Sequence, residues 1–304
     1  MSAISKEEVA LYDRQIRLWG MEAQARLRSS SICFQGIKAV TLEACKNLVL
    51  AGVGRITLND SSPITHDDLE TQYYFQPDDL GEPRDRVLAA RLAALNPLVD
   101  VRAGAQTDDA FDVVVAVGAQ RAAAEGARWR RQNVKFVAAD AVGLFGFVFV
   151  DCLRHEFVEE VKSGDETRQV RGVQEYVPLE QSLAGKVQGT NVQRLQRRYP
   201  ALAFVFQAVV AEGLDADAVS AEELGRLVRA GLRSRGIAEE MVNDDIIRQV
   251  RVAQSWGTEL VPCAAVVGGT LAQEVLKIVT LKDMPVNNWY LYDALRGDGI
   301  TCQL

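Results

Sequence analysis

Residues 31–60 read SICFQGIKAVTLEACKNLVLAGVGRITLND, and this stretch decides the fold. The short apolar run 31–35 predicts a strand, and Gly36 opens a turn after it. Residues 40–51 carry apolar side chains at helical spacing, which predicts a helix with one buried side. Residues 55–60 supply a second strand that ends in an acid. A strand–turn–helix–strand–acid unit is typical of the opening of a doubly wound α/β fold.

Composition limits the classes of function. The chain has 304 residues, 48% of them hydrophobic, which suits one large or two modest domains. A net charge of −7 argues against a nucleic-acid surface. The five scattered cysteines contain no Cys-x-x-Cys pair, so we expect neither a zinc site nor a disulfide framework. Residues 1–10 lack the apolar core of a secretory signal, and the polar residues within 261–281 predict a buried helix rather than a membrane span.

The rest of the chain predicts one α/β domain with an insertion. Residues 1–161 and 257–304 should form a Rossmann-like domain with a mostly parallel sheet, in which 143–150 and 156–161 pair as a hairpin. Residues 162–256 should form a small inserted helical lobe. The segments that carry this prediction are strands at 99–103, 111–117, 134–139 and 288–293, and helices at 84–95, 120–132, 202–211, 221–235, 239–256 and 263–279.

The turn after the first strand is a poor phosphate-binding loop. Such loops need glycines, because the backbone must approach phosphate at the helix N-terminus. Here only Gly36 is glycine, and residues 39–41 place β-carbons where bare backbone is needed. We therefore expect no tight NAD or ATP binding at this loop. Lys38 could meet an anion or be a solvated lysine, and Asp60 is interpreted as a fold remnant or a helix cap.

Nucleophilic and metal chemistry have few candidate residues. A reactive thiol needs a lowered pKa, and only Cys263 begins a predicted helix, where its apolar neighbours indicate burial. The inserted lobe has no cysteine between residues 200 and 256, so it cannot form a thioester. The two histidines, His66 and His155, are expected at the surface or in turns.

A second distinctive stretch, YDRQIRLWG, spans residues 12–20. The Ser5 and Glu8 pair is a capping box, which predicts a short helix leading into this stretch. Ile16, Leu18 and Trp19 are expected to anchor it.

Two arginines, Arg14 and Arg17, lie on this anchored arm. A guanidinium held in place suits phosphate, because its planar fork is always charged and binds oxyanions through two hydrogen bonds. The alternative is that both are ordinary solvated charges beside a buried tryptophan.

The arm as a whole resembles the N-terminal signature of the ubiquitin-like-protein activating enzymes. Residues 44–52, 262–277 and 287–293 resemble later motifs of the same family in the same order. The resemblance implies a ThiF-type fold and an arm that reaches across a pseudo-symmetric dimer, where its first arginine, matched here by Arg14, touches ATP in the other half. Interface candidates on the arm are Tyr12, Ile16, Arg17 and Trp19.

Several groups of an active adenylation site are replaced here. Residues 70–73 read Glu-Thr-Gln-Tyr where active members have Asn-Arg-Gln-Phe, Arg84 matches a lysine, and residues 117–120 lack the acid that holds magnesium. The resemblance therefore implies a pseudo-site without a bound cofactor or metal. Its remnants are Gly36, Lys38, Asp60 and Arg84.

Among activating enzymes, the chain is most similar to the regulatory subunits of the heterodimeric SUMO-activating enzymes. That likeness implies a catalytic partner subunit that holds ATP, magnesium and the thioester cysteine, indirect contact with SUMO, and a place in the nucleus and cytoplasm. Neither nucleic acid nor membrane is expected as a partner.

The alternatives are the regulatory subunit for the cullin modifier, which is normally longer, and a scaffold subunit without a chemical role. A homodimeric sulfur-carrier adenylating enzyme and a nicotinamide oxidoreductase would both need the missing glycine loop.

Overall fold

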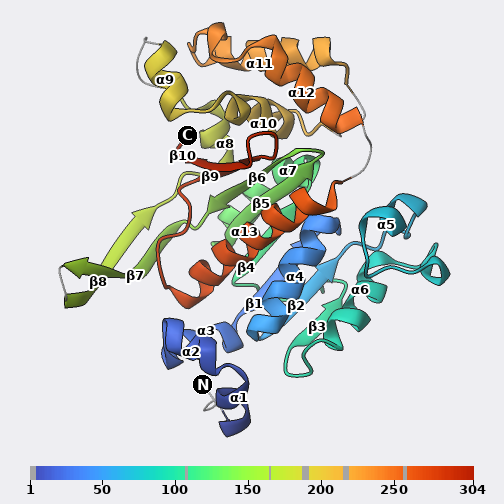
Figure 1. The fold of residues 1–304 in the computed structure, drawn as a ribbon, viewed down its shortest axis with the longest axis vertical. Coiled ribbons are helices and arrows are strands. Elements are labelled where there is room, and N and C mark those ends of the chain that lie inside the picture. The colour runs from blue at the N-terminus through green and yellow to red at the C-terminus, as the bar shows by residue number, and fades with distance from the viewer. Residues whose placement is uncertain (1–4, 107–108, 164–165, 187–191, 215–218, 256–258) are drawn as a thin grey trace.

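The computed structural model describes residues 5–106, 109–163, 166–186, 192–214, 219–255 and 259–304. Its centre is an eight-stranded sheet in the order β10-β9-β6-β5-β4-β1-β2-β3 (Figure 1). Strands β1 to β5 pair in parallel, and β6, β9 and β10 are added antiparallel at one side. The predicted doubly wound, mostly parallel fold is confirmed. The strands are β1 (Ser31–Gln35), β2 (Arg55–Asn59), β3 (Asp100–Ala103), β4 (Val113–Val117), β5 (Lys135–Val142), β6 (Phe145–Asp151), β7 (Arg154–Ser163), β8 (Glu166–Glu175), β9 (Trp289–Asp293) and β10 (Asp298–Cys302).

Helices cover both faces of the sheet. Helices α4 and α13 lie side by side on one face, and α7 and α8 to α12 lie on the other (Figure 1). The helices are α1 (Lys6–Leu11), α2 (Asp13–Trp19), α3 (Met21–Ser29), α4 (Ala39–Ala51), α5 (His66–Thr71), α6 (Arg84–Ala93), α7 (Ala119–Arg131), α8 (Leu179–Ala184), α9 (Val192–Arg198), α10 (Ala201–Ala211), α11 (Ala221–Ser234), α12 (Asp244–Ser255) and α13 (Val261–Thr280), with 3₁₀ turns η1 (Pro77–Asp79) and η2 (Glu239–Met241).

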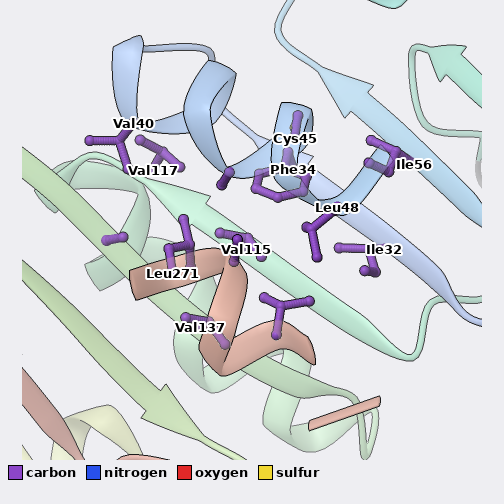
Figure 2. Close-up of a cluster of buried hydrophobic side chains, with 14 of the residues drawn as sticks. Ile32, Phe34, Val40, Cys45, Leu48, Ile56, Val115, Val117, Val137 and Leu271 are labelled. Carbon is purple, nitrogen blue, oxygen red and sulfur yellow. The ribbon is translucent and has the colours of Figure 1, made fainter. Parts of the chain in front are cut away.

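The central strands are apolar throughout because each face has its own core. On β1, Ile32 and Phe34 belong to the core under α4 and α13, whereas Cys33 belongs to the core under α7 and α10. Successive side chains of a strand point to opposite faces, so a strand covered on both faces has no polar side. Figure 2 shows the first of these cores, in which Val115 and Leu271 lie near Leu48.

Helix α13 lies within this core. By length and composition it is the one described helix that could cross a membrane, yet 67% of its most apolar window is buried inside the fold. It packs against α4 and β6, and Gly268 allows the close approach, since an added β-carbon would lie 2.7 Å from the carbonyl oxygen of Val40. The prediction of a buried helix is thus confirmed.

The predicted hairpin of 143–150 with 156–161 is wrong. Strand β6 pairs with β5 and β9 inside the main sheet, and β7 pairs with β8 as a separate two-stranded ribbon. This ribbon projects from the body in Figure 1. Most residues of β8 are polar, so the sequence after residue 161 resembles a loop rather than a strand. The short elements α5, α8, α9 and β10 were also missed.

Helices of the predicted inserted lobe pack directly on the sheet. Phe206 of α10 lies 5.2 Å from Phe147 of β6 between ring centroids, and Trp289 of β9 lies 5.6 Å from the same ring. The expected boundary at residue 161 falls within β7. Helices α8 to α12 therefore bury their apolar sides in a core shared with the sheet.

Candidate functional site

The first candidate site lies after the carboxyl end of β1. Gly36 has φ +95°, and an added β-carbon would lie 2.7 Å from the carbonyl oxygen of Val117. The turn therefore needs glycine for both its conformation and its closeness to β4. The residues that follow, Ile37 to Ala39, lead directly into α4.

Asp60 holds this loop. Its buried carboxylate accepts hydrogen bonds from the backbone nitrogen of Ile37 at 2.8 Å and from that of Ser62 at 3.2 Å. The guanidinium of Arg121 lies 3.5 Å from the same carboxylate, and that of Arg84 lies 3.9 Å away. The two carboxylate oxygens thus already have partners within the chain, which favours the structural interpretation of Asp60 over a ribose contact.

Lys38 and Arg84 are also engaged within the chain. The Lys38 ammonium forms an ion pair with the buried Asp140 on β5 at 2.9 Å. The Arg84 guanidinium donates to Asp68 at 2.6 and 3.0 Å, and Asp68 also caps α5. Asp140 and Asp68 were missed in the sequence because nothing in their spacing links them to the loop.

Glu259 is the most informative residue that sequence reasoning missed. Its carboxylate accepts a hydrogen bond from the backbone nitrogen of Ala39, the first residue of α4, at 2.6 Å. Burial raises the pKa of Glu259 to about 7, although the ammonium of Lys38 acts in the opposite direction. Only the packing of α13 beside α4 places Glu259 here, because 220 residues separate the two partners.

The loop does not fit the phosphates of ATP. Of its backbone nitrogens, that of Ile37 is bonded to Asp60, that of Lys38 to the hydroxyl of Thr41 at 3.2 Å, and that of Ala39 to Glu259. Among the described residues, no group of three or more His, Cys, Asp or Glu side chains could hold a metal ion.

The cysteines and His155 are buried. All five thiols are free, and burial raises the pKa of each, to about 12 for Cys33 and Cys302. This shift disfavours the nucleophilic thiolate.

His66 is exposed at the start of α5 as expected, but the expectation of a surface position for His155 is wrong. His155 is 1% exposed, because β7 turns it inward, and burial lowers its pKa to about 4.

The second candidate site is the N-terminal arm, formed by α1 and α2. The predicted capping box is present: Glu8 and Ser5 exchange hydrogen bonds of 2.8 and 3.2 Å. Glu8 also forms an ion pair with Arg28 of α3 at 2.9 Å, which ties the first helix to the body.

Tyr12 fixes the middle of the arm. It is 5% exposed, and its hydroxyl accepts a hydrogen bond from the side-chain amide of Asn96 at 2.8 Å. Its ring lies over Gly52, where an added β-carbon would be 2.5 Å from the ring. Tyr12, proposed from the sequence as an interface residue, is thus buried against its own chain.

Trp19 fixes the end of the arm, whereas Leu18 does not. The Trp19 indole nitrogen donates to Gln24 at 3.0 Å, and Gln24 donates to the carbonyl of Ala51 at 3.1 Å. Ile16 is half-buried. Leu18 is 77% exposed, so the expectation that it anchors the arm to this chain is wrong, because α2 turns it toward solvent.

Arg14 is exposed on the arm. It makes no hydrogen bond or ion pair with any residue in the described ranges. Arg17, in contrast, pairs with Asp13 one turn earlier at 2.9 Å. Of the two arginines, Arg14 is therefore the one whose guanidinium has no partner among the residues that the structure describes.

The two candidate sites lie at opposite ends of the sheet. Helix α3 ends at Ser29, immediately before the amino end of β1, whereas the loop at Gly36 follows the carboxyl end. Figure 1 shows α1 to α3 beyond the end of the sheet where β1 begins. A strand of this length spans roughly 15 Å, so Arg14 does not serve its own chain's loop.

Comparison with known proteins agrees with this fold and arm. The model of the ThiF family matches residues 12–110, which include α2 of the arm, the loop and α4. SUMO-activating enzyme subunit 1 of Rattus norvegicus is 32% identical and that of Homo sapiens 30% identical, each over 98% of this chain and over 94% and 95% of the relative. The DNA damage tolerance protein RHC31 of Saccharomyces cerevisiae is 29% identical over 97% of this chain and 96% of its own length.

Solved structures support the fold alone. The crystal structure of selenomethionine PaaA covers 100% of this chain and 85% of its own, with a TM-score of 0.59 and 13% sequence identity. The two SUMO-activating enzyme subunits, in contrast, are 32% and 30% identical to this chain over 98% of its length. On that similarity, the chain belongs to the family of SUMO-activating enzyme subunit 1 proteins.

Proposed function

We propose that this chain is the non-catalytic half of a heterodimeric, ATP-dependent SUMO-activating enzyme, and that it contributes Arg14 to the ATP site of its partner. The observation that carries the proposal is the state of Arg14, which is exposed, has no partner among the described residues, and lies on an arm fixed at Tyr12 and Trp19.

Three further features support this division of work. The chain's own loop has its donors bonded internally, and its thiols are buried. Arg14 lies at the end of the sheet away from that loop. The catalytic partner would therefore hold ATP, magnesium and the thioester cysteine, and would contact SUMO directly. Ile16, Arg17 and Trp19 stay candidates for the interface, and residence in the nucleus and cytoplasm belongs to the same proposal.

The test is ATP–pyrophosphate exchange by this chain reconstituted with a SUMO-type catalytic subunit. We expect Arg14→Ala to lower SUMO-dependent exchange by about tenfold or more, because a hydrogen bond to a charged group contributes about 1.5–3 kcal/mol. Arg14→Lys should retain part of the rate, since it keeps the charge without the planar fork.

The matched control is Arg248→Ala, which removes an exposed arginine of α12 that pairs with Asp245. Size-exclusion chromatography checks that each variant assembles with the partner. Unchanged exchange in an assembled Arg14→Ala heterodimer would leave the chain as a scaffold without a chemical role. Exchange by the chain alone would refute its non-catalytic assignment.

A further inference from the structure

The residue that occupies the start of α4 is an acid of the chain itself. In a nucleotide-binding loop, the first turn of this helix presents backbone nitrogens to a phosphate, and the helix dipole favours the negative charge. Here the nitrogen of Ala39 donates to the carboxylate of Glu259 at 2.6 Å. A carboxylate oxygen is an acceptor of the same kind as a phosphate oxygen.

The contact is part of a closed set of interactions. The backbone nitrogen of Ile37 donates a hydrogen bond to Asp60, and that of Lys38 donates one to the hydroxyl of Thr41. The Thr41 hydroxyl in turn donates to the carbonyl of Gly36 at 2.8 Å. The ammonium of Lys38 is bonded to Asp140 on β5 at 2.9 Å. The backbone nitrogens of Ile37 and Lys38 thus have partners near the loop, and Glu259 supplies the partner of the next one, that of Ala39.

Glu259 reaches this position from the opposite end of the chain. It precedes α13, which begins at Val261 and packs along α4. The second carboxylate oxygen of Glu259 is buried and has no hydrogen-bond partner. A carboxylate held with one oxygen unsatisfied is costly, so its bond to Ala39 and the helix start offset part of that cost.

We propose that the carboxyl group of Glu259 closes this chain's own nucleotide loop, by taking the place at the start of α4 that a phosphate would otherwise occupy. The degraded glycine pattern and the internal acid are then two separate obstacles to nucleotide. Removing Glu259 alone should uncover an oxyanion site at Ala39, whether or not the proposal for Arg14 is correct.

The probe is inorganic pyrophosphate, followed by the amide resonance of Ala39 in ¹⁵N-labelled full-length chain. In Glu259→Ala we expect this resonance to shift saturably with pyrophosphate, at least about tenfold more tightly than in the unaltered chain. The matched control is Glu240→Ala, which removes an exposed acid of η2. A folded Glu259→Ala variant whose Ala39 amide does not respond would overturn the proposal, and so would an equal response in the unaltered chain.

A second measurement covers the case in which Glu259→Ala does not fold. Ala39→Pro removes the donor at the first helical position, where proline is tolerated, and Lys38 already has the extended backbone that a residue before proline adopts. We expect the change in denaturation midpoint caused by Glu259→Gln to be smaller in the Ala39→Pro background than alone. Additive effects of the two substitutions would contradict a direct bond between these residues.

Discussion

The indole nitrogen of Trp289 donates a hydrogen bond to the hydroxyl of Ser182 at 2.8 Å, and this bond joins a strand of the sheet to the helices inserted before it. Both residues are fully buried. Trp289 lies on β9, 5.0 Å from the ring of Phe149 on β6, and Ser182 lies on α8. A buried polar pair of this kind fixes how the helices sit on the sheet.

Ser182→Ala should therefore destabilise the chain by about 1–3 kcal/mol, because it leaves a buried indole donor without a partner. Urea denaturation of the purified chain measures the change. In a Trp289→Phe background, which has no donor, the same substitution should cost clearly less. An equal cost in both backgrounds would mean that Ser182 stabilises the core through packing alone.

Gly52→Ala should loosen the N-terminal arm. Gly52 has φ +83°, and an added β-carbon would meet the Tyr12 ring at 2.5 Å. We expect a loss of about 1–3 kcal/mol in the free energy of unfolding. Gly81→Ala is the matched control, since Gly81 has φ +84° with no atom within 4 Å of the added carbon.

Limited proteolysis separates the two effects of this substitution. The backbone strain is common to both variants, so only Gly52→Ala should also speed cleavage within the arm, near Arg14 and Arg17. Equal cleavage of the arm in both variants would show that Tyr12 tolerates the extra methyl group.

Glu259 should make stability depend on pH near neutrality. Burial raises its pKa from 4.5 to about 7, Lys38 opposes the shift, and Asp140 and Asp68 add to it. Between these two pKa values Glu259 binds more protons in the folded chain than in the unfolded chain, so its contribution to stability falls as the pH rises from about 4.5 to 7 and then levels off. The lowered pKa of His155 acts in the opposite direction over much of this range. Glu259→Gln should remove the contribution of Glu259 alone, so the difference in stability between the variant and the unaltered chain should change with pH across that range, as measured by urea denaturation.

The control for the pH experiment is Glu240→Gln, an exposed acid whose loss should leave the slope unchanged. A Glu259→Gln variant whose stability changes with pH between 4.5 and 7 in the same way as that of the unaltered chain would show that Glu259 makes no such contribution.

The thiols should react slowly in the folded chain. All five cysteines are buried, and burial raises the pKa of each, including Cys263 at the start of α13. At neutral pH a thiol reagent should label the native protein far more slowly than the urea-unfolded protein, in which five groups become available. Rapid labelling of native Cys263 would contradict this and would reopen the question of a nucleophilic cysteine.

The sequence was sufficient for the parts of the fold with strong local patterns. The strand 31–35 has the predicted bounds and the capping box of Ser5 is present, because apolar runs and capping are local signals. A strand was predicted at 156–161, within β7, but β8 and its pairing with β7 were missed, because the polar residues after 161 resemble a loop.

The candidate site divides in the same way. Arg14, Gly36, Lys38 and Asp60 were identified from local motifs. Glu259 could not be, because it meets Ala39 only after α13 has packed beside α4. Likewise, the contact of Asn96 with Tyr12 crosses 84 residues, so sequence alone gave Tyr12 as an interface candidate and did not reveal its contact within its own chain.

The anchoring of the arm also has an entropic consequence. Tyr12 and Trp19 hold α2 at both ends, so the backbone around Arg14 is ordered when the chain folds rather than when it meets a partner. Fixing a residue's backbone costs about 1–2 kcal/mol, and that cost is then absent from association. The guanidinium of Arg14 is therefore held close to any surface that the arm faces. Its effective concentration at that surface is much higher than that of free guanidinium in solution.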